Sequence, residues 1–396
     1  MVAGNDVLVK QLLEKFSGYV HSPENLAKKK FWLGEDRPFP IERWRGIPAL
    51  KEKSTYTMAM DISGYSPVLG IDCAKYYSEP EANLIGQLQY GIWEYENIPG
   101  GRYFENTVFC SLASVYDASL FGAPVYFLPN QAPWYDEKNP VLKEKSDLLK
   151  LKPFDFETTG LLPTVRAMYE HHVKATEGFD LKPLFPTTMR SQFSTAIMLR
   201  GFENLLMDMI DDPDFFEDLM AHITGVYKEY AIARKQYLGE DTLEPGLLGN
   251  DEVSTPMVSP MFYDELIFPY EKEIGEFWGG VRYWHSCGQT EAFYETVSTL
   301  PGLQLMHIGP WSDIAKAVEV FGPKDISIEI CRNNNRDLYD KTEEEMEADL
   351  QAIKDLCEGK VKYQVRMDGI AILKNKEHTL EKIETWKRVA KKVFGD

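Results

Sequence analysis

The chain has 396 residues, 44% of them hydrophobic, which is enough to bury the core of one large α/β domain or of two ordinary ones. Its 43 basic and 62 acidic side chains leave a net charge of −19, which argues against nucleic acid or an anionic membrane surface as a partner. No apolar stretch approaches the roughly 18 residues of a membrane span, and the N-terminus lacks the pattern of a signal peptide, so we expect a cytoplasmic protein.

The N-terminal part, residues 1–60, is predicted to form an irregular, partly helical cap, because its stretch RPFPIERWRGIPAL is rich in proline and arginine. Residues 61–396 are predicted to form one catalytic domain. Strands are expected near residues 122–129 (GAPVYFLP) and 243–251 (LEPGLLGND), and the long stretch between residues 194 and 239 is expected to be helical.

The second half of the chain alternates regularly between strand and helix patterns. Strands are predicted at residues 279–287, 303–309, 325–330 and 360–366, and helices at 290–300, 312–322, 341–359 and 379–395. Ser312 is predicted as an N-cap, Gly322 as a helix stop, and Thr342 with Glu345 as a capping box.

Four successive βα units require parallel strands joined by helical crossovers. A doubly wound sheet would carry a glycine-rich dinucleotide turn, which the sequence lacks. We therefore predict an α/β fold, a (β/α)8 barrel with helical insertions, whose chemistry lies at the C-terminal ends of the strands.

A histidine and a cysteine stand one residue apart in VRYWHSCG. His285 and Cys287 are at i and i+2 of a predicted strand, so both side chains point to the same face. Zinc binds imidazole nitrogen and thiolate sulfur, and catalytic zinc sites use three protein ligands with a position left for substrate. The alternative is a buried histidine that hydrogen-bonds the backbone beside an inert buried cysteine.

The third ligand should come from another strand end, and the five scattered cysteines form no disulfide framework that would occupy their thiols. Cys331 closes a predicted strand and is our predicted third ligand, although an inert buried thiol would fit the same pattern. Cys357 falls on an outer helix and is discounted.

The remaining polar residues at strand ends are assigned to substrate and catalysis. Arg190, Asn250 and Asp251 are predicted to bind substrate, and Glu252 and His307 to act in catalysis. For the carboxylates a solvated loop is the alternative, and for His307 the alternative is a core or outer-shell histidine.

The sequence resembles the uroporphyrinogen decarboxylase superfamily, and within it the corrinoid-dependent methyltransferase branch. The resemblance rests on FGAPVYFLPNQAPW, on GNDEVSTPMVSPMFYDELIFPYEKEI and above all on HSCGQTEAFYETVSTLPGLQLMHIGPWSDIAKAVEVFG, and it extends from about residue 60 to the C-terminus. It implies the same barrel, and zinc ligation by His285 and Cys287. Members that methylate a thiol carry a further cysteine in a turn on the last strand, where this chain reads YQVRMDG, so Cys331 or a carboxylate such as Glu252 is left to complete the site.

The resemblance implies the substrate-side component of an O-demethylase system. Zinc would polarise the oxygen of an aryl methyl ether, and a cobalt(I) corrinoid (cobalamin) carried by a partner protein would take the methyl group, leaving a phenol. A nearby Asp or Glu acting as general acid would serve the same purpose.

Other readings of the same sequence stay open. A methyltransferase acting on a thiol or a methylamine would use the same fold. A decarboxylase would need no metal but would need a basic pocket, and the arginine-rich turn of the decarboxylases is missing. A corrinoid carrier would need a cobalt-binding Asp-x-His-x-x-Gly loop, which is also missing. A homodimer is one option for the assembly.

Overall fold

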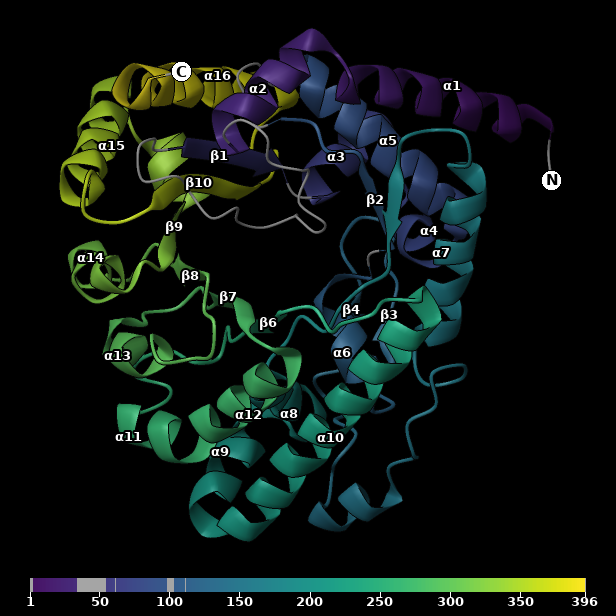
Figure 1. The fold of residues 1–396 in the computed structure, drawn as a ribbon, viewed down its shortest axis with the longest axis vertical. Helices are drawn as coiled ribbons and strands as arrows, with labels where there is room; N and C mark the ends of the chain where they lie inside the picture. Colours follow the sequence, from purple (N-terminus) through teal and green to yellow (C-terminus); the bar gives the residue numbers. More distant parts are fainter. Residues whose placement is uncertain (1–2, 34–54, 61, 98–102, 111, 396) are drawn as a thin grey trace.

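In the part of the chain that the structure describes, eight short parallel strands lie at the centre, surrounded by helices (Figure 1). The structure is a computed structural model and describes residues 3–33, 55–60, 62–97, 103–110 and 112–395. The proline- and arginine-rich stretch predicted to be irregular lies outside these residues. The central strands are β1 (Thr55–Met60), β2 (Thr107–Phe109), β5 (Lys182–Leu184), β6 (Gly246–Gly249), β7 (Val281–His285), β8 (Leu305–Ile308), β9 (Ser327–Arg332) and β10 (Tyr363–Ile370).

The pairing of these strands follows a barrel. Six of them form one sheet in the order β1-β10-β9-β8-β7-β6, so the last strand of the chain pairs with the first. At the other edge Arg190, beyond β5, forms a parallel bridge to Gly249 of β6, and β5 pairs with β2. Neighbours in sequence are thus neighbours in space, as in a (β/α)8 barrel. The described residues of β1 and β2 form no ladder with each other.

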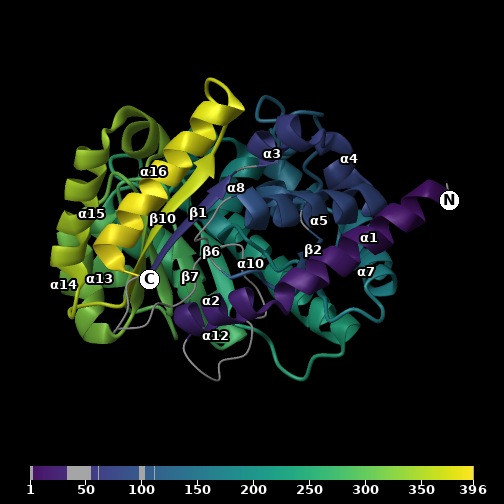
Figure 2. The same cartoon turned by 90° about the horizontal axis from the view of Figure 1, so that it is seen from above.

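Helices cover the outside of the strands. Figure 2 shows α14, α15 and α16 on one side of the sheet. The helices are α1 (Ala3–Val20), α2 (Pro23–Leu33), α3 (Ile62–Leu69), α4 (Cys73–Ser78), α5 (Pro80–Asn97), α6 (Tyr116–Ser119), α7 (Leu162–Ala175), α8 (Gln192–Arg200), α9 (Phe202–Asp211), α10 (Pro213–Leu238), α11 (Pro260–Phe262), α12 (Phe268–Trp278), α13 (Tyr294–Val297), α14 (Ile314–Phe321), α15 (Glu343–Cys357) and α16 (Lys376–Phe394). None of the described helices is both long and apolar enough to cross a bilayer.

The four predicted βα units of the second half are confirmed, from β7 to α16. The predicted strand at residues 243–251 is confirmed as β6, and the helical stretch before it is divided into α8, α9 and α10. The capping box of Thr342 and Glu345 is confirmed. Ser312 is not the N-cap of α14, because Asp313 accepts the hydrogen bond from the first turn.

The predicted strand at residues 122–129 is not a strand of the barrel. Its only described strand residues, β3 (Val125–Tyr126), pair antiparallel with β4 (Trp134–Tyr135) in a small hairpin. Pro124 and Pro129 flank β3, and proline cannot donate a hydrogen bond to a central ladder. The barrel strand that precedes this segment is β2 instead.

The first 60 residues contain both cap and barrel. Helix α1 lies along α5 (Figure 1), and Leu13 and Phe16 of α1 pack with Leu84 and Leu88 of α5 in a separate apolar cluster. Strand β1, however, pairs with β10 in the central sheet. The barrel therefore begins before residue 61.

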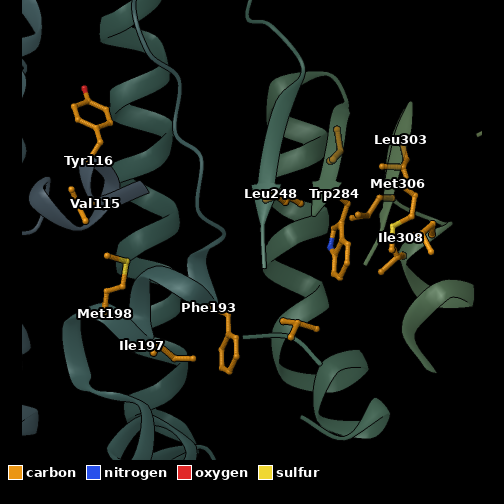
Figure 3. Packing of buried hydrophobic residues seen from close by; sticks show 14 of the residues in the cluster. Val115, Tyr116, Phe193, Ile197, Met198, Leu248, Trp284, Leu303, Met306 and Ile308 are labelled. Carbon is orange, nitrogen blue, oxygen red and sulfur yellow. The ribbon is translucent and has the colours of Figure 1, made fainter. Parts of the chain in front are cut away.

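The main core fills the space between the strands and the surrounding helices. Leu248 of β6 and Trp284 of β7 are register partners and lie side by side in Figure 3, with Met306 and Ile308 on the next strand. All four side chains are fully buried. Because successive residues of a strand point to opposite faces, their neighbours His285 and His307 point into the barrel.

Candidate metal centre and barrel mouth

One layer of residues crosses five adjacent strands inside the barrel. Gly249 is the register partner of His285, and His307 pairs with Glu329, which pairs with Gln364. Between β7 and β8 the last paired residues of the ladder are Trp284 and Met306, so His285 and His307 are the next two residues opposite each other. The centroids of their rings lie 4.0 Å apart.

Gly249 is required at this point because the chain beyond β5 approaches it closely. A Cβ at Gly249 would lie 2.5 Å from the carbonyl oxygen of Met189. The same contact carries a backbone hydrogen bond of 2.8 Å from Gly249 to Met189. Any larger residue would push the bridged chain away from β6 and displace Arg190, which follows Met189.

The ligand atoms of His285, Cys287 and His307 converge at the C-terminal ends of β7 and β8. These atoms all lie within 4.8 Å of one another, and Nε2 of His285 is 3.2 Å from Sγ of Cys287. Both histidines are buried, whereas Cys287 is exposed. The group is therefore held by the barrel interior and reached from its mouth.

Below this group, the hydroxyl of Tyr283 contacts both histidines. Its oxygen is 3.2 Å from Nδ1 of His285 and 3.0 Å from Nδ1 of His307, and it donates a 2.5 Å hydrogen bond to Glu329. Arg366 lies 3.4 Å from Glu329. Burial alone would raise the pKa of Glu329, but the charge of Arg366 and the hydrogen bonds from His307 and Tyr283 bring that pKa well below its usual range.

Beside the group of His285, Cys287 and His307, Asp251 lies between His285 and the buried Arg190. One carboxylate oxygen is 3.1 Å from Nε2 of His285, and the other accepts a 2.8 Å hydrogen bond from Arg190. Arg190 also lies 3.6 Å from Glu252, whose carboxylate accepts a hydrogen bond from Ser194. Burial raises the pKa of Glu252, although the charge of Arg190 and this hydrogen bond lower it in part.

Asn250 was predicted to bind substrate, and the structure places it elsewhere. Because Gly249 and Asp251 point into the barrel, the side chain of Asn250 points outward, where it donates a 2.8 Å hydrogen bond to Glu271 of α12. Glu271 also accepts hydrogen bonds from Tyr263 at 2.8 Å and from Trp284 at 3.0 Å. Asn250 therefore ties β6 to a helix behind the site.

Glu271 gives the protein a specific pH dependence. Burial raises its pKa from 4.5 to about 7, although the hydrogen bonds from Tyr263, Trp284 and Asn250 act in the opposite direction. The folded state thus holds the proton more tightly, so this group's contribution to stability is fully present below about pH 4.5 and is lost as the pH rises through about 7. Between about pH 4.5 and 7, the unfolding free energy of Glu271→Gln should fall by about 3 kcal/mol less than that of the wild type, measured by urea denaturation.

A surface substitution, Glu319→Gln on α14, is the control and should keep the wild-type slope. An unchanged slope in Glu271→Gln would show that Glu271 does not exchange its proton between the folded and unfolded states in this range.

Cys331, predicted as the third metal ligand, does not belong to the group of His285, Cys287 and His307. It lies on β9, two strands away from β7, and neighbouring strands are about 4.8 Å apart. Its sulfur instead lies 3.8 Å from the carbonyl oxygen of Arg332. His307, on the strand adjacent to β7, occupies the position that the sequence assigned to Cys331.

Comparison with known proteins agrees with this architecture. The family model described as Uroporphyrinogen decarboxylase (URO-D) matches residues 106–363, which is more than half of the chain. The chain belongs to the uroporphyrinogen decarboxylase family. The structure is similar to that of a methyltransferase from Methanosarcina mazei, with a TM-score of 0.61 and 15% sequence identity over 87% of this chain and 94% of that chain. None of the curated proteins matches it.

In this member of the uroporphyrinogen decarboxylase family, the residues at the barrel mouth suit a zinc ion. Ligand atoms at about 2.0–2.3 Å from a tetrahedral zinc lie roughly 3.3–3.8 Å apart, close to the separation of His285 Nε2 from Cys287 Sγ. Nε2 of His307 is buried and has no hydrogen-bond partner among the described residues. Two imidazoles and one thiolate form a donor set that zinc accepts and that leaves a position open.

Several residues of the site were not found from the sequence. Tyr283 could have been, because it stands two residues before His285 and shares its face of the strand. Glu329 could also have been found, because it is the only charged residue within the run ISIEI, and a buried charge requires a partner. Arg366, the partner of Glu329, lies on a different strand, and no local signal connects the two.

Proposed function

We propose that this protein is a zinc-dependent methyltransferase that moves the methyl group of an aryl methyl ether to the cobalt(I) corrinoid of a partner protein. The observation that carries the proposal is the group of His285, Cys287 and His307 at the C-terminal mouth of the barrel. A catalytic zinc site needs three protein ligands and one open position, and this group supplies the three. The resemblance to the corrinoid-dependent branch supplies the reaction class.

A bound zinc ion would act as a Lewis acid toward the ether oxygen, which makes the phenol a better leaving group. In the balanced reaction the methyl–oxygen bond breaks and a cobalt–carbon bond forms. The phenolate then takes up one proton, and the cobalt(I) centre of the partner is the methyl acceptor. The exposed position of Cys287 leaves the mouth open to a docking corrinoid protein.

Glu252 is proposed as the general acid that supplies this proton. It lies beside Arg190 and Asp251 at the mouth, and burial raises its pKa, which is the direction that a general acid requires. We expect Glu252→Gln to lower kcat for demethylation by about 10²- to 10⁴-fold while zinc content stays at the wild-type level. The measurement is steady-state kinetics on metal-analysed protein. A variant with wild-type kcat would remove Glu252 from the mechanism.

Arg190 argues against the decarboxylase alternative. A site for a polycarboxylate substrate needs arginines that are available to the substrate, but Arg190 already faces the carboxylates of Asp251 and Glu252. The thiol alternative is disfavoured because only one cysteine belongs to the described metal group. A methylamine substrate uses the same site, and it becomes the leading proposal if methoxyarenes are inactive.

The test is a methyl-transfer assay. Zinc-loaded protein is incubated with a panel of methoxylated benzoates and phenols and with free cob(I)alamin, and methylcobalamin and phenol are quantified together. Equal amounts of both products would support the proposal. Transfer from methylamines or to thiols, with no transfer from any methoxyarene, would replace the proposed substrate class.

A further inference from the structure

The phenol of Tyr283 has one proton, and at least three polar groups of the described residues contact its oxygen. Its oxygen contacts Nδ1 of His285, Nδ1 of His307 and the carboxylate of Glu329 at 3.2, 3.0 and 2.5 Å. A phenol can donate one hydrogen bond and can also accept. Once one neighbour accepts this proton, the phenol oxygen can only accept hydrogen bonds from the other two.

Glu329 receives the proton of Tyr283. Its carboxylate is fully buried and is surrounded by donors: Gln364 donates at 2.7 Å, Arg366 lies 3.4 Å away, and Nδ1 of His307 lies 3.3 Å away. An ionised carboxylate can only accept hydrogen bonds. The short contact between Tyr283 and Glu329 is therefore a hydrogen bond from the phenol to the carboxylate.

The oxygen of Tyr283 can then only accept from the imidazoles. Nδ1 of His285 faces this oxygen at 3.2 Å, and Nδ1 of His307 faces two acceptors, this oxygen at 3.0 Å and Oε1 of Glu329 at 3.3 Å. A histidine with a bare Nδ1 would direct its lone pair at an oxygen that has no proton left to give. Both histidines therefore carry the proton on Nδ1, and in the neutral ring Nε2 is left with a lone pair.

The surroundings of Nε2 agree with this assignment. For His307, a proton on Nε2 would be a buried donor without an acceptor, because this atom has no hydrogen-bond partner among the described residues. For His285 two acceptors compete, because Nδ1 faces the oxygen of Tyr283 at 3.2 Å and Nε2 faces the carboxylate of Asp251 at 3.1 Å, so the tautomer of this ring depends on Tyr283.

We propose that Tyr283 and Glu329 are positioning residues that hold His285 and His307 in the Nδ1–H tautomer and so present both Nε2 atoms to the same point. Tyr283 accepts from His285, and Tyr283 and Glu329 both face Nδ1 of His307. The role of the Nε2 atoms as metal ligands rests on the proposed function, but the tautomer itself does not. Glu329 and Arg366 complete the arrangement, because the ionised carboxylate is what draws the phenol proton away from the histidines.

The test reads the tautomer directly in metal-free protein. Long-range proton–nitrogen correlation spectra of protein with ¹⁵N-labelled histidine, recorded at about pH 8, distinguish a protonated ring nitrogen from a bare one. His285→Ala and His307→Ala assign the signals. In wild type both rings should show a protonated Nδ1 and a bare Nε2. In Tyr283→Phe the ring of His285 should shift toward the Nε2–H tautomer, because Nε2 lies 3.1 Å from Asp251, whereas the ring of His307 should keep its proton on Nδ1, which still faces Glu329 at 3.3 Å.

Tyr227→Phe is the matched control, because Tyr227 is also a fully buried tyrosine whose hydroxyl bonds a side chain, Thr195, at 2.6 Å. It should leave both rings unchanged. In a competition titration with zinc alone, Tyr283→Phe should weaken binding by about 10- to 100-fold, whereas Tyr227→Phe should change it by less than about threefold.

A protonated Nε2 on His307 in wild type, or an unchanged tautomer of His285 in Tyr283→Phe, would overturn the inference. The predicted tautomers in a wild-type protein that binds no zinc would uphold the inference and overturn the proposed metal function instead.

Discussion

Replacing either Cys287 or His307 with alanine is expected to reduce zinc in the purified protein from about one ion per chain to almost none. Each residue supplies one of three converging ligand atoms, and a zinc ion left with two protein ligands is weakly held. Demethylation should fall by about a thousandfold or more, because the Lewis acid stabilises the transition state by several kcal/mol. Metal analysis and methyl-transfer kinetics on the same samples measure both effects.

Cys331→Ala and Cys357→Ala are the matched controls for the thiol. Both cysteines lie outside the ligand group, and both variants should keep their zinc. If Cys331→Ala lost the metal while His307→Ala kept it, the ligand set predicted from the sequence would be right and the geometry of β8 and β9 would be wrong.

Replacing Arg366 with methionine is expected to destabilise the metal-free protein by about 3–5 kcal/mol. The substitution leaves the buried carboxylate of Glu329 without its cationic partner, and an uncompensated buried charge is costly. Urea unfolding at neutral pH measures the change in unfolding free energy. Combining Arg366→Met with Glu329→Gln should restore part of the loss, since no charge is then left unpaired.

Arg388→Met provides the surface comparison. Arg388 pairs with Glu343 at 2.6 Å, but both side chains are about half exposed, so the expected loss is below about 1 kcal/mol. Similar losses in Arg366→Met and Arg388→Met would mean that Glu329 is not held as a buried anion.

Much of the fold could be predicted because barrel strands and helices leave local patterns. The regular alternation from β7 to α16 is visible in the apolar periodicity, and the capping box of Thr342 and Glu345 marks one helix start. The failure at residues 122–129 had a local warning, since Pro124 and Pro129 flank a short apolar run. The very short β2 and β5 gave no comparable signal.

For the site, the sequence showed which residues share a strand face but not which strands are adjacent. His285 and Cys287 follow from the i, i+2 rule alone. The third position required the strand order, which brings β8 next to β7 and keeps Cys331 one strand farther away. The outward position of Asn250 could have been anticipated, because a residue between two inward-facing positions of a strand points outward.

Arg190 and Asp251 are predicted from the sequence to bind substrate and Glu252 to act in catalysis, and the structure brings the three together beside His285. Their meeting depends on the close approach of Met189 to Gly249, a contact between separate segments that no single stretch of sequence encodes. Their assignment to substrate and catalysis stays a prediction.

Single-turnover methyl transfer tests the central claim most directly. Zinc-loaded wild type and metal-stripped wild type are each mixed with a methoxyarene and cob(I)alamin, and the conversion of cobalt(I) to methylcobalamin is followed by absorbance. We predict conversion with the zinc-loaded protein, none with the stripped protein, and recovery when zinc is returned. Equal conversion by the loaded and stripped proteins would contradict a role for a metal at His285, Cys287 and His307.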